Sequence, residues 1–356
     1  NKWLGSKTGQ GFYKKEGKDI LTLDLDTLEY RANKKASFAT LELTKTIEKP
    51  IDRFKVLVTG KDKAGDFYRK NFASMFQYCS NRIPEITDAF YKIDDAMKAG
   101  FGWENGPFEI WDAIGVEKGI ELMKAEGYQP ASWVTDMLAS GNTSFYSVKD
   151  GATHFYSITN KKVEKIPGQD AFIILNNIRE SKKIWNNSDS IITDLGDGII
   201  NLEFTSKMNS IGAGVLQGIN KAIDIAEKDY NGLVIGNQGA NFSVGANLGM
   251  IFMMAVEQEY DELNMAIKMF QDTMMRCRYS AIPVIAAPHG MTLGGGCELT
   301  MHADRAVAAA ETYIGLVEFG VGVIPGGGGS KEMALRASDL FRKNDVELNV
   351  LQEYFL

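Results

Sequence analysis

The sequence contains few of the residues that build disulfide scaffolds and metal sites. Its 356 residues include only 3 cysteines, Cys79, Cys277 and Cys297, and only 3 histidines. The cysteines are odd in number and far apart, so they predict free thiols in a reducing compartment rather than a disulfide framework or a zinc site. No two histidines have the spacing of metal ligands, and we expect no bound metal.

The sequence also lacks an excess of positive charge, long apolar runs and a leader pattern. The formal net charge is -7 and the pI is near 5.3, which argues against general binding to a nucleic-acid backbone. No apolar run reaches membrane-spanning length, and the opening stretch NKWLGSKTGQGFYKK has no signal-peptide pattern. We therefore expect a cytoplasmic protein that binds neither nucleic acid nor membrane.

The two ends of the sequence have no clear boundaries. The first residue is not Met, and the last stretch, LNVLQEYFL, has the spacing of an amphipathic helix without a stop signal. We expect both ends to be cut from a longer protein, the C-terminal one within a domain. The length itself predicts two or three domains.

The first half has the pattern of a helical domain. Over residues 51–130, apolar residues recur at the 3.6-residue spacing of helices, and Pro84 is expected to interrupt them. We also expect a helix over residues 26–47. Residues 131–185 are polar and less regular, with a hairpin expected at 152–167, and they are interpreted as a connecting segment.

From residue 186 onward, strand and helix patterns alternate, which predicts an α/β domain. Three stretches in it have the order strand, glycine-rich turn, helix: NFSVGANLG at 241–249, TLGGGCEL at 292–299 and VEFGVGVIPGGGG at 317–329. Glycine lets a ligand approach the unpaired N–H groups at a helix start. Two such turns facing each other can present two N–H groups to one oxygen, which is an oxyanion hole.

Two carboxylates accompany these turns. Glu298 lies in the first turn of the helix that follows the triple glycine, and Glu318 lies in the apolar stretch LVEFG, expected at the end of a strand. Apolar surroundings raise the pKa of a carboxyl group, which can then exchange a proton near neutral pH. Because glycine-rich turns are often only tight turns and surface glutamates only solvated, these residues alone do not fix a reaction.

The stretches FSVGANL, LGGGCEL and VEFGVGVIPGGGG resemble, in the same order, three signatures of the crotonase (enoyl-CoA hydratase) family. TSKMNSIGAGVLQGINKAI is similar to the CoA-contacting turn and helix of that family. The resemblance covers roughly residues 186–335. It implies an α/β crotonase-like domain of ββα repeats over residues 186–356, truncated at its C-terminus.

The resemblance also implies roles for particular residues. Ala246 and Gly295 would donate the N–H groups of the oxyanion hole, and Glu298 and Glu318 would be the two catalytic acids. Asn247 stands where many relatives have Asp, at a position that is more structural than chemical in the family. Contacts to the substrate are implied at Met208, Asn209, Ser243, Gly245, Asn247 and Gly294.

The first half resembles another family. WLGSKTGQGFY looks like the closing segment of a 3-hydroxyacyl-CoA dehydrogenase C-terminal domain, and NRIPEITDAFYKIDDAMKAGFGWENGPFEIWDAIG looks like a further copy of that all-α domain. Residues 1–50 would then be the end of one copy with a linker, and residues 51–130 a second copy. The nucleotide-binding domain of that family, with GxGxxG and a catalytic His, is not in this sequence. We therefore expect no cofactor in this chain, with NAD confined to the absent domain.

Some residues of the helical copy could carry function or only packing. Asn81 aligns with an Asn that assists the dehydrogenase, but we interpret this copy as a packing repeat. We expect four aromatic residues to lie in its core rather than around a ligand: Phe101, Trp103, Phe108 and Trp111.

Taken together, the resemblances imply a bifunctional protein of fatty-acid β-oxidation whose C-terminal part hydrates trans-2-enoyl-CoA to 3-hydroxyacyl-CoA. A Δ3,Δ2-enoyl-CoA isomerase is an alternative, although it needs only one carboxylate. A non-catalytic acyl-CoA binding or assembly module is another. Acyl-CoA is the expected partner, and the acyl chain length, association into a homo-oligomer and the identity of the base stay open.

Overall fold

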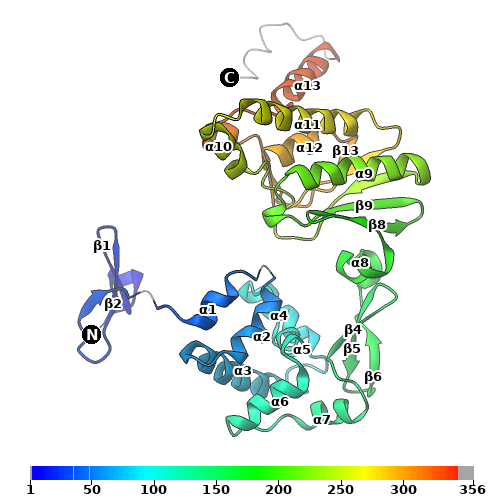
Figure 1. The fold of residues 1–356 in the computed structure, drawn as a ribbon. Coiled ribbons are helices and arrows are strands. Elements are labelled where there is room, and N and C mark those ends of the chain that lie inside the picture. Colours follow the sequence, from blue (N-terminus) through cyan, green and yellow to red (C-terminus); the bar gives the residue numbers. More distant parts are fainter. Residues whose placement is uncertain (1, 35, 48, 344–356) are drawn as a thin grey trace. The chain divides into compact units, whose positions relative to one another are not determined.

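The computed structural model describes residues 2–34, 36–47 and 49–343. These residues form two compact units (Figure 1). The first unit takes in the chain up to residue 147 together with 153–166, and the second unit takes in 148–152 and the chain from 167 onward. The helix expected for LNVLQEYFL lies outside the described residues.

The first unit opens with a small antiparallel sheet. Its strands are β1 Tyr13–Glu16, β2 Asp19–Leu23 and β3 Tyr30–Ala32. A short helix, α1 Ala39–Thr44, follows them. The expectation of a helix over residues 26–47 is therefore wrong for its first half. The side chain of Asp24 accepts hydrogen bonds from the amides of Asp26 and Thr27, and Leu28 has a left-handed φ of 59°, so this stretch forms a turn between β2 and β3.

Helices then follow one another up to residue 139, as expected for residues 51–130. They are α2 Pro50–Thr59, α3 Lys63–Asn81, α4 Tyr91–Phe101, α5 Pro107–Ile114, α6 Val116–Ala125 and α7 Ser132–Ala139. The break expected at Pro84 is confirmed, because α3 ends at Asn81.

An aromatic cluster forms the core of the helical part. The rings of Phe76 and Trp111 stack with centroids 4.7 Å apart, and Phe108 is also fully buried. The expectation that Phe101 and Trp103 are core residues is wrong, because they are 76% and 39% exposed. They flank the left-handed turn that ends α4 and carries them to the surface.

A hairpin and a helix follow. The hairpin expected at 152–167 is confirmed by antiparallel pairing of β5 Ala152–Ser157 with β6 Lys162–Lys165, and β4 Tyr146–Lys149 completes its sheet. The second unit then contains η2 Gln169–Ala171 and α8 Leu175–Lys182.

A six-stranded sheet is the frame of the second unit, with strand order β13-β11-β10-β9-β8-β7. β7–β9 pair antiparallel, and β9, β10, β11 and β13 pair parallel. Its strands are β7 Lys183–Asn186, β8 Ser190–Gly196, β9 Ile199–Phe204, β10 Gly232–Ile235, β11 Val284–Ala286 and β13 Arg305–Ala306. This mixture of sheet and helices confirms the predicted α/β class.

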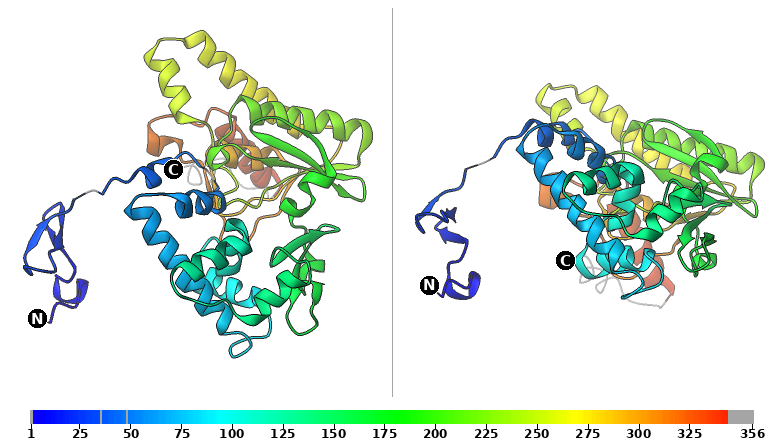
Figure 2. Two further views of the ribbon diagram at one scale, coloured as in Figure 1. Left: turned by 60° about the horizontal axis from the view of Figure 1, so that its bottom comes forward. Right: turned by 90° about the horizontal axis from the view of Figure 1, so that it is seen from below.

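Helices pack on this sheet and on one another. α9 Ala213–Asp229 covers strands β8–β10 and contacts α11 Tyr260–Arg278 (Figure 1). The core between them contains Ile200, Leu202 and Ile219, all fully buried. α10 Leu248–Val256 precedes α11, and the two are joined by a bend (Figure 2). Every helix in the described ranges is too short or too polar to span a lipid bilayer.

Short elements carry the predicted site. They are η3 Lys207–Asn209, β12 Met291–Leu293, α12 Gly295–His302, β14 Tyr313–Gly315, η4 Glu318–Val321 and α13 Gly329–Lys343. β12 and β14 pair parallel. The expectation that Glu318 ends a strand is wrong, because β14 stops at Gly315 and Glu318 opens η4. Gly322, with a left-handed φ of 84°, ends η4, so the backbone there is not extended as in a strand.

Candidate active site

Two glycine turns lie against each other in the second unit. The segment before Ala246 runs beside β12, where Leu293 N donates to Ser243 O at 2.9 Å. Gly245 has φ +86°, and a Cβ built on it would lie 2.8 Å from Leu293 O and 2.9 Å from Gly295 N. Only glycine fits at this approach, because any side chain would push the two turns apart.

This approach brings the amides of Ala246 and Gly295 together. A Cβ built on Gly295 would lie 3.5 Å from the amide nitrogen of Ala246. Gly295 is the first residue of α12, so its N–H has no acceptor within the helix. The Ala246 amide has no hydrogen-bond partner within the described part of the chain. The structure therefore leaves two neighbouring N–H groups without an acceptor among the described residues.

Glu298 is a buried carboxylate held by a third glycine-rich turn. It is 3% exposed, and its Oε1 accepts hydrogen bonds from Gly327 N at 2.8 Å and Gly329 N at 2.9 Å. Burial raises the pKa of Glu298 above its ordinary value of 4.5, the charge of Glu318 acts in the same direction, and the two amides act against it. Such a group can exchange a proton closer to neutral pH than an exposed glutamate.

Glu318 lies on the other side of the triple glycine. A Cβ built on Gly294 would lie 3.2 Å from its Oε1, so the carboxylate contacts the turn that leads to Gly295. Its Oε2 is buried and has no hydrogen-bond partner among the described residues. A buried oxygen without a partner is suited to bind a water or a substrate group.

Cys297 lies between these groups but does not have the properties of a nucleophile. Burial raises the pKa of its thiol to about 11, and the carboxylates of Glu318 and Glu298 act in the same direction. The thiol is therefore protonated at neutral pH, and the reactive form of cysteine is the thiolate.

The segment that carries these turns and carboxylates is similar to a known protein family. Residues 195–338 match the family model described as enoyl-CoA hydratase/isomerase, and this range contains both glycine turns and both carboxylates. Over these residues the chain is similar to that family.

Curated relatives extend beyond the family domain. A protein of Bacillus subtilis named "Probable 3-hydroxyacyl-CoA dehydrogenase" is 45% identical over 332 residues, which cover 93% of this chain and 42% of the relative. A "Putative fatty acid oxidation complex trifunctional enzyme" of Rickettsia felis is 28% identical, over 94% of this chain and 43% of the relative. The chain thus spans less than half the length of these relatives.

Solved structures of enoyl-CoA hydratases also match. One from Bacillus anthracis is 25% identical, with a TM-score of 0.38, over 41% of this chain and 57% of that one. Another, from Thermoplasma volcanium, is 28% identical, with a TM-score of 0.37, over 41% of this chain and 58% of that one.

The turn predicted to contact substrate is joined to the two facing glycine turns by hydrogen bonds. Met208 and Asn209 have left-handed φ values of 55° and 53°, and Met208 is 56% exposed. Asn209 Nδ2 donates to Asn241 O at 2.9 Å, and Ser243 Oγ donates to Asn209 O at 2.7 Å. Ser243 Oγ in turn accepts from Gly245 N at 3.1 Å, so this turn and the Gly245 approach form one connected unit.

The two other predicted substrate positions have structural contacts. Asn247 caps α10, where its Oδ1 accepts from Met250 N at 3.3 Å, which fits a structural role. Gly294 has φ +51° and its amide donates to Gly315 O at 2.9 Å, which joins the triple glycine to β14.

The structure adds groups that the sequence analysis did not identify. The amides of Gly327 and Gly329 hold Glu298, and the ring of Phe270 fills the space beside two glycines. A Cβ built on Gly295 would lie 2.7 Å from Phe270 Cζ, and one on Gly327 would also collide with that ring. Phe270 comes from α11, whose apolar spacing is visible in YDELNMAIKMFQDTMMRCR and was the available signal.

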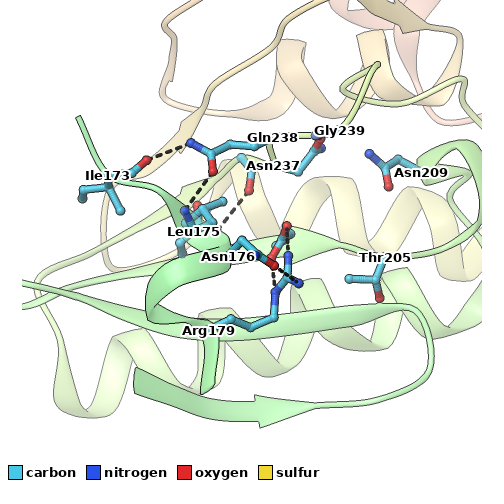
Figure 3. Close-up of polar contacts among 12 residues, drawn as sticks. Ile173, Leu175, Asn176, Arg179, Thr205, Asn209, Asn237, Gln238 and Gly239 are labelled. Carbon is cyan, nitrogen blue, oxygen red and sulfur yellow. Dashed lines mark hydrogen bonds and ion pairs between the residues drawn. The ribbon is translucent and has the colours of Figure 1, made fainter. Parts of the chain in front are cut away.

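A polar junction lies at the start of the loop that leads to Ala246 (Figure 3). Gln238 Oε1 accepts from Leu175 N, and its Nε2 donates to Ile173 O, each at 2.8 Å. Beside it, Arg179 of α8 pairs with the buried Glu203 of β9 at 2.7 Å. α8, which precedes the family-matched range, is thereby attached to the loop and the sheet that support the site.

Proposed function

We propose that the second unit adds water to the double bond of a trans-2-enoyl-CoA thioester to give 3-hydroxyacyl-CoA. The observation that carries this proposal is the convergence of two unpaired amides and two buried carboxylates around the same glycine turns. The match of residues 195–338 to the enoyl-CoA hydratase/isomerase family model supports it.

The amide pair would act on the thioester oxygen. When water attacks the β-carbon, negative charge develops on that oxygen as an enolate forms. The N–H groups of Ala246 and Gly295 would donate to it, and preorganised donors of this kind stabilise the transition state more than the ground state.

The carboxylates would handle the water. Glu298 and Glu318 would hold one water molecule between them, and one of them would accept its proton as the oxygen bonds to the β-carbon. The other would assist delivery of a proton to the α-carbon, so that the elements of one water are added across the double bond. The charge of Glu318 raises the pKa of Glu298, which favours a proton on Glu298.

Substrate binding would use the residues that frame the turns. Met208, Asn209, Ser243, Gly245, Asn247 and Gly294 are the proposed contacts to the acyl-CoA. Hydration involves no net oxidation or reduction, so we infer that this chain uses no cofactor of its own and that acyl-CoA is its substrate.

For the whole protein, we infer a bifunctional role in fatty-acid β-oxidation. Its curated relatives carry the names of a 3-hydroxyacyl-CoA dehydrogenase and a fatty acid oxidation complex. A dehydrogenase domain elsewhere in the protein would oxidise the 3-hydroxyacyl-CoA that the second unit produces.

The test is turnover by the full-length protein. Loss of the enoyl-thioester absorbance of crotonyl-CoA supports hydration. Conversion of a 3-enoyl-CoA without hydration of crotonyl-CoA would instead show an isomerase, for which one carboxylate is enough. Saturable acyl-CoA binding without any turnover would show a binding module and would overturn the proposed reaction.

A further inference from the structure

Glu332 is a buried charged residue that the proposed reaction does not use. It lies in the first turn of α13 and is 0% exposed. Its amide donates to Gly328 O at 2.9 Å, within the same turn whose Gly327 and Gly329 amides hold Glu298. A buried carboxylate is costly unless it is paired, so its partners show what it does.

Its partners come from three helices. Arg278 of α11 forms an ion pair with Glu332 Oε2, and Lys331 Nζ lies 3.1 Å from its Oε1. His302 of α12 places its Nε2 3.4 Å from the same Oε1. Glu332 therefore joins the start of α13 to α11, and His302 of α12 lies beside it.

His302, which lies beside Glu332, is hydrogen-bonded to the backbone of Glu298. Its Nδ1 lies 2.7 Å from Glu298 O, and because a carbonyl oxygen only accepts, Nδ1 carries the proton. Burial holds the pKa of His302 below its ordinary value of 6.5, so the ring is neutral at pH 7. The ring thus lies between the peptide of Glu298 and the carboxylate of Glu332.

We propose that Glu332 is a positioning residue for Glu298, because it anchors the turn that supplies the Gly327 and Gly329 amides to that carboxylate. The anchoring is inferred from the contacts of Glu332 alone, whereas its expected effect on the reaction rate rests on the proposed hydration. The oxyanion-hole amides come from other segments, at Ala246 and Gly295, so the inference separates proton transfer from substrate binding.

The first experiment uses Glu332→Gln in the full-length protein. Glutamine keeps the size of the side chain but removes the charge that pairs with Arg278. We expect kcat for crotonyl-CoA to fall roughly 10- to 100-fold, the range in which a misplaced catalytic group acts, with KM changed less than about twofold. The acidic limb of the pH profile should move upward by about one pH unit, since Glu298 loses amide donors.

Asp339→Asn is the matched control. It removes one carboxylate charge from the same helix, but Asp339 is exposed and no ion pair to it is described. Its rate and pH profile should match those of the unmutated protein. An unchanged pH profile in Glu332→Gln, with kcat also unchanged, would overturn the inference.

Two further measurements test the inference if Glu332→Gln does not fold or if the proposed function is wrong. If Glu332→Gln does not fold, Arg278→Gln weakens the same ion pair from a side chain that is 35% exposed, and it should shift the profile in the same direction. If the unmutated protein does not hydrate crotonyl-CoA, the pKa of Glu298 can be measured directly by carbon-13 NMR titration. The Glu298 signal is assigned by its loss in Glu298→Gln. A higher pKa of Glu298 in Glu332→Gln supports the anchoring, and an unchanged pKa overturns it.

Discussion

Gly245 illustrates how one residue type controls the site. Its φ of +86° is in the left-handed region, and Leu293 O and Gly295 N occupy the space that a side chain would need. Composition and motif order pointed to this turn, but they could not give its distance from the turn at Gly294 and Gly295. That distance depends on the pairing of the Ser243 segment with β12, which is separated from it by about 50 residues of chain.

Substituting Gly245→Ala should separate the two amides. The new Cβ would lie 2.9 Å from Gly295 N, and the left-handed backbone adds strain on the order of 1 kcal/mol. Since removing one oxyanion-hole donor costs roughly 100- to 1,000-fold in kcat, we expect a fall of at least about 100-fold with crotonyl-CoA. Gly100→Ala is the control, because no atom lies within 4 Å of its Cβ position. Equal rates in the two variants would contradict the proposed role of the turn.

At the scale of elements, the sequence predicted what repeats with a regular period. From residue 186 onward it predicted alternating strands and helices, and the structure has β8 and β9 on either side of the Gly196–Gly198 turn, followed by α9 with apolar positions at helical spacing. The position of Glu318 in η4 could not be predicted, because an apolar LVEFG stretch has no period that separates a strand from a short 3-10 turn. The left-handed turn at Leu28 likewise overrode a helical pattern.

The attachment of α8 is a testable element-scale feature. Gln238→Ala removes both hydrogen bonds to the segment that enters α8, each worth about 1 kcal/mol. Local opening of residues 175–182 should then become roughly 30-fold more frequent, measured by hydrogen exchange. Glu180→Gln, on the same helix but 83% exposed, should leave exchange unchanged. Equal protection in Gln238→Ala would show that α8 is held by other contacts.

At the scale of the whole molecule, buried carboxyl groups should make the stability of the first unit depend on pH. In the first unit, Asp94 is fully buried and accepts from Phe108 N at 2.9 Å, and Asp112 accepts from Phe145 N at 2.7 Å. Burial raises the pKa of each carboxyl from 3.8 to about 7. The folded unit therefore binds more protons than the unfolded chain between these two values.

In this range protons favour the folded state, so raising the pH destabilises the fold. The free energy of unfolding of the first unit should therefore decrease as pH rises from about 4 to about 7, by about 4 kcal/mol in total for the Asp94 carboxyl alone. Near-UV circular dichroism, which reports the aromatic cluster, should give a lower denaturation midpoint at about pH 8.5 than at about pH 5.5. Asp112→Asn should reduce this difference. A midpoint that rises with pH would contradict the account.

The central claim is that Glu298 and Glu318 act on one water while the amide pair binds the thioester. Because a general acid–base group contributes roughly 100- to 10,000-fold, Glu298→Gln in the full-length protein should slow crotonyl-CoA hydration by at least about 100-fold while enoyl-CoA affinity changes little. Glu318→Gln should behave similarly, and the double variant should lose less than the product of the two effects. Full activity in Glu298→Gln would contradict the mechanism, and no hydration by the unmutated protein would contradict the function.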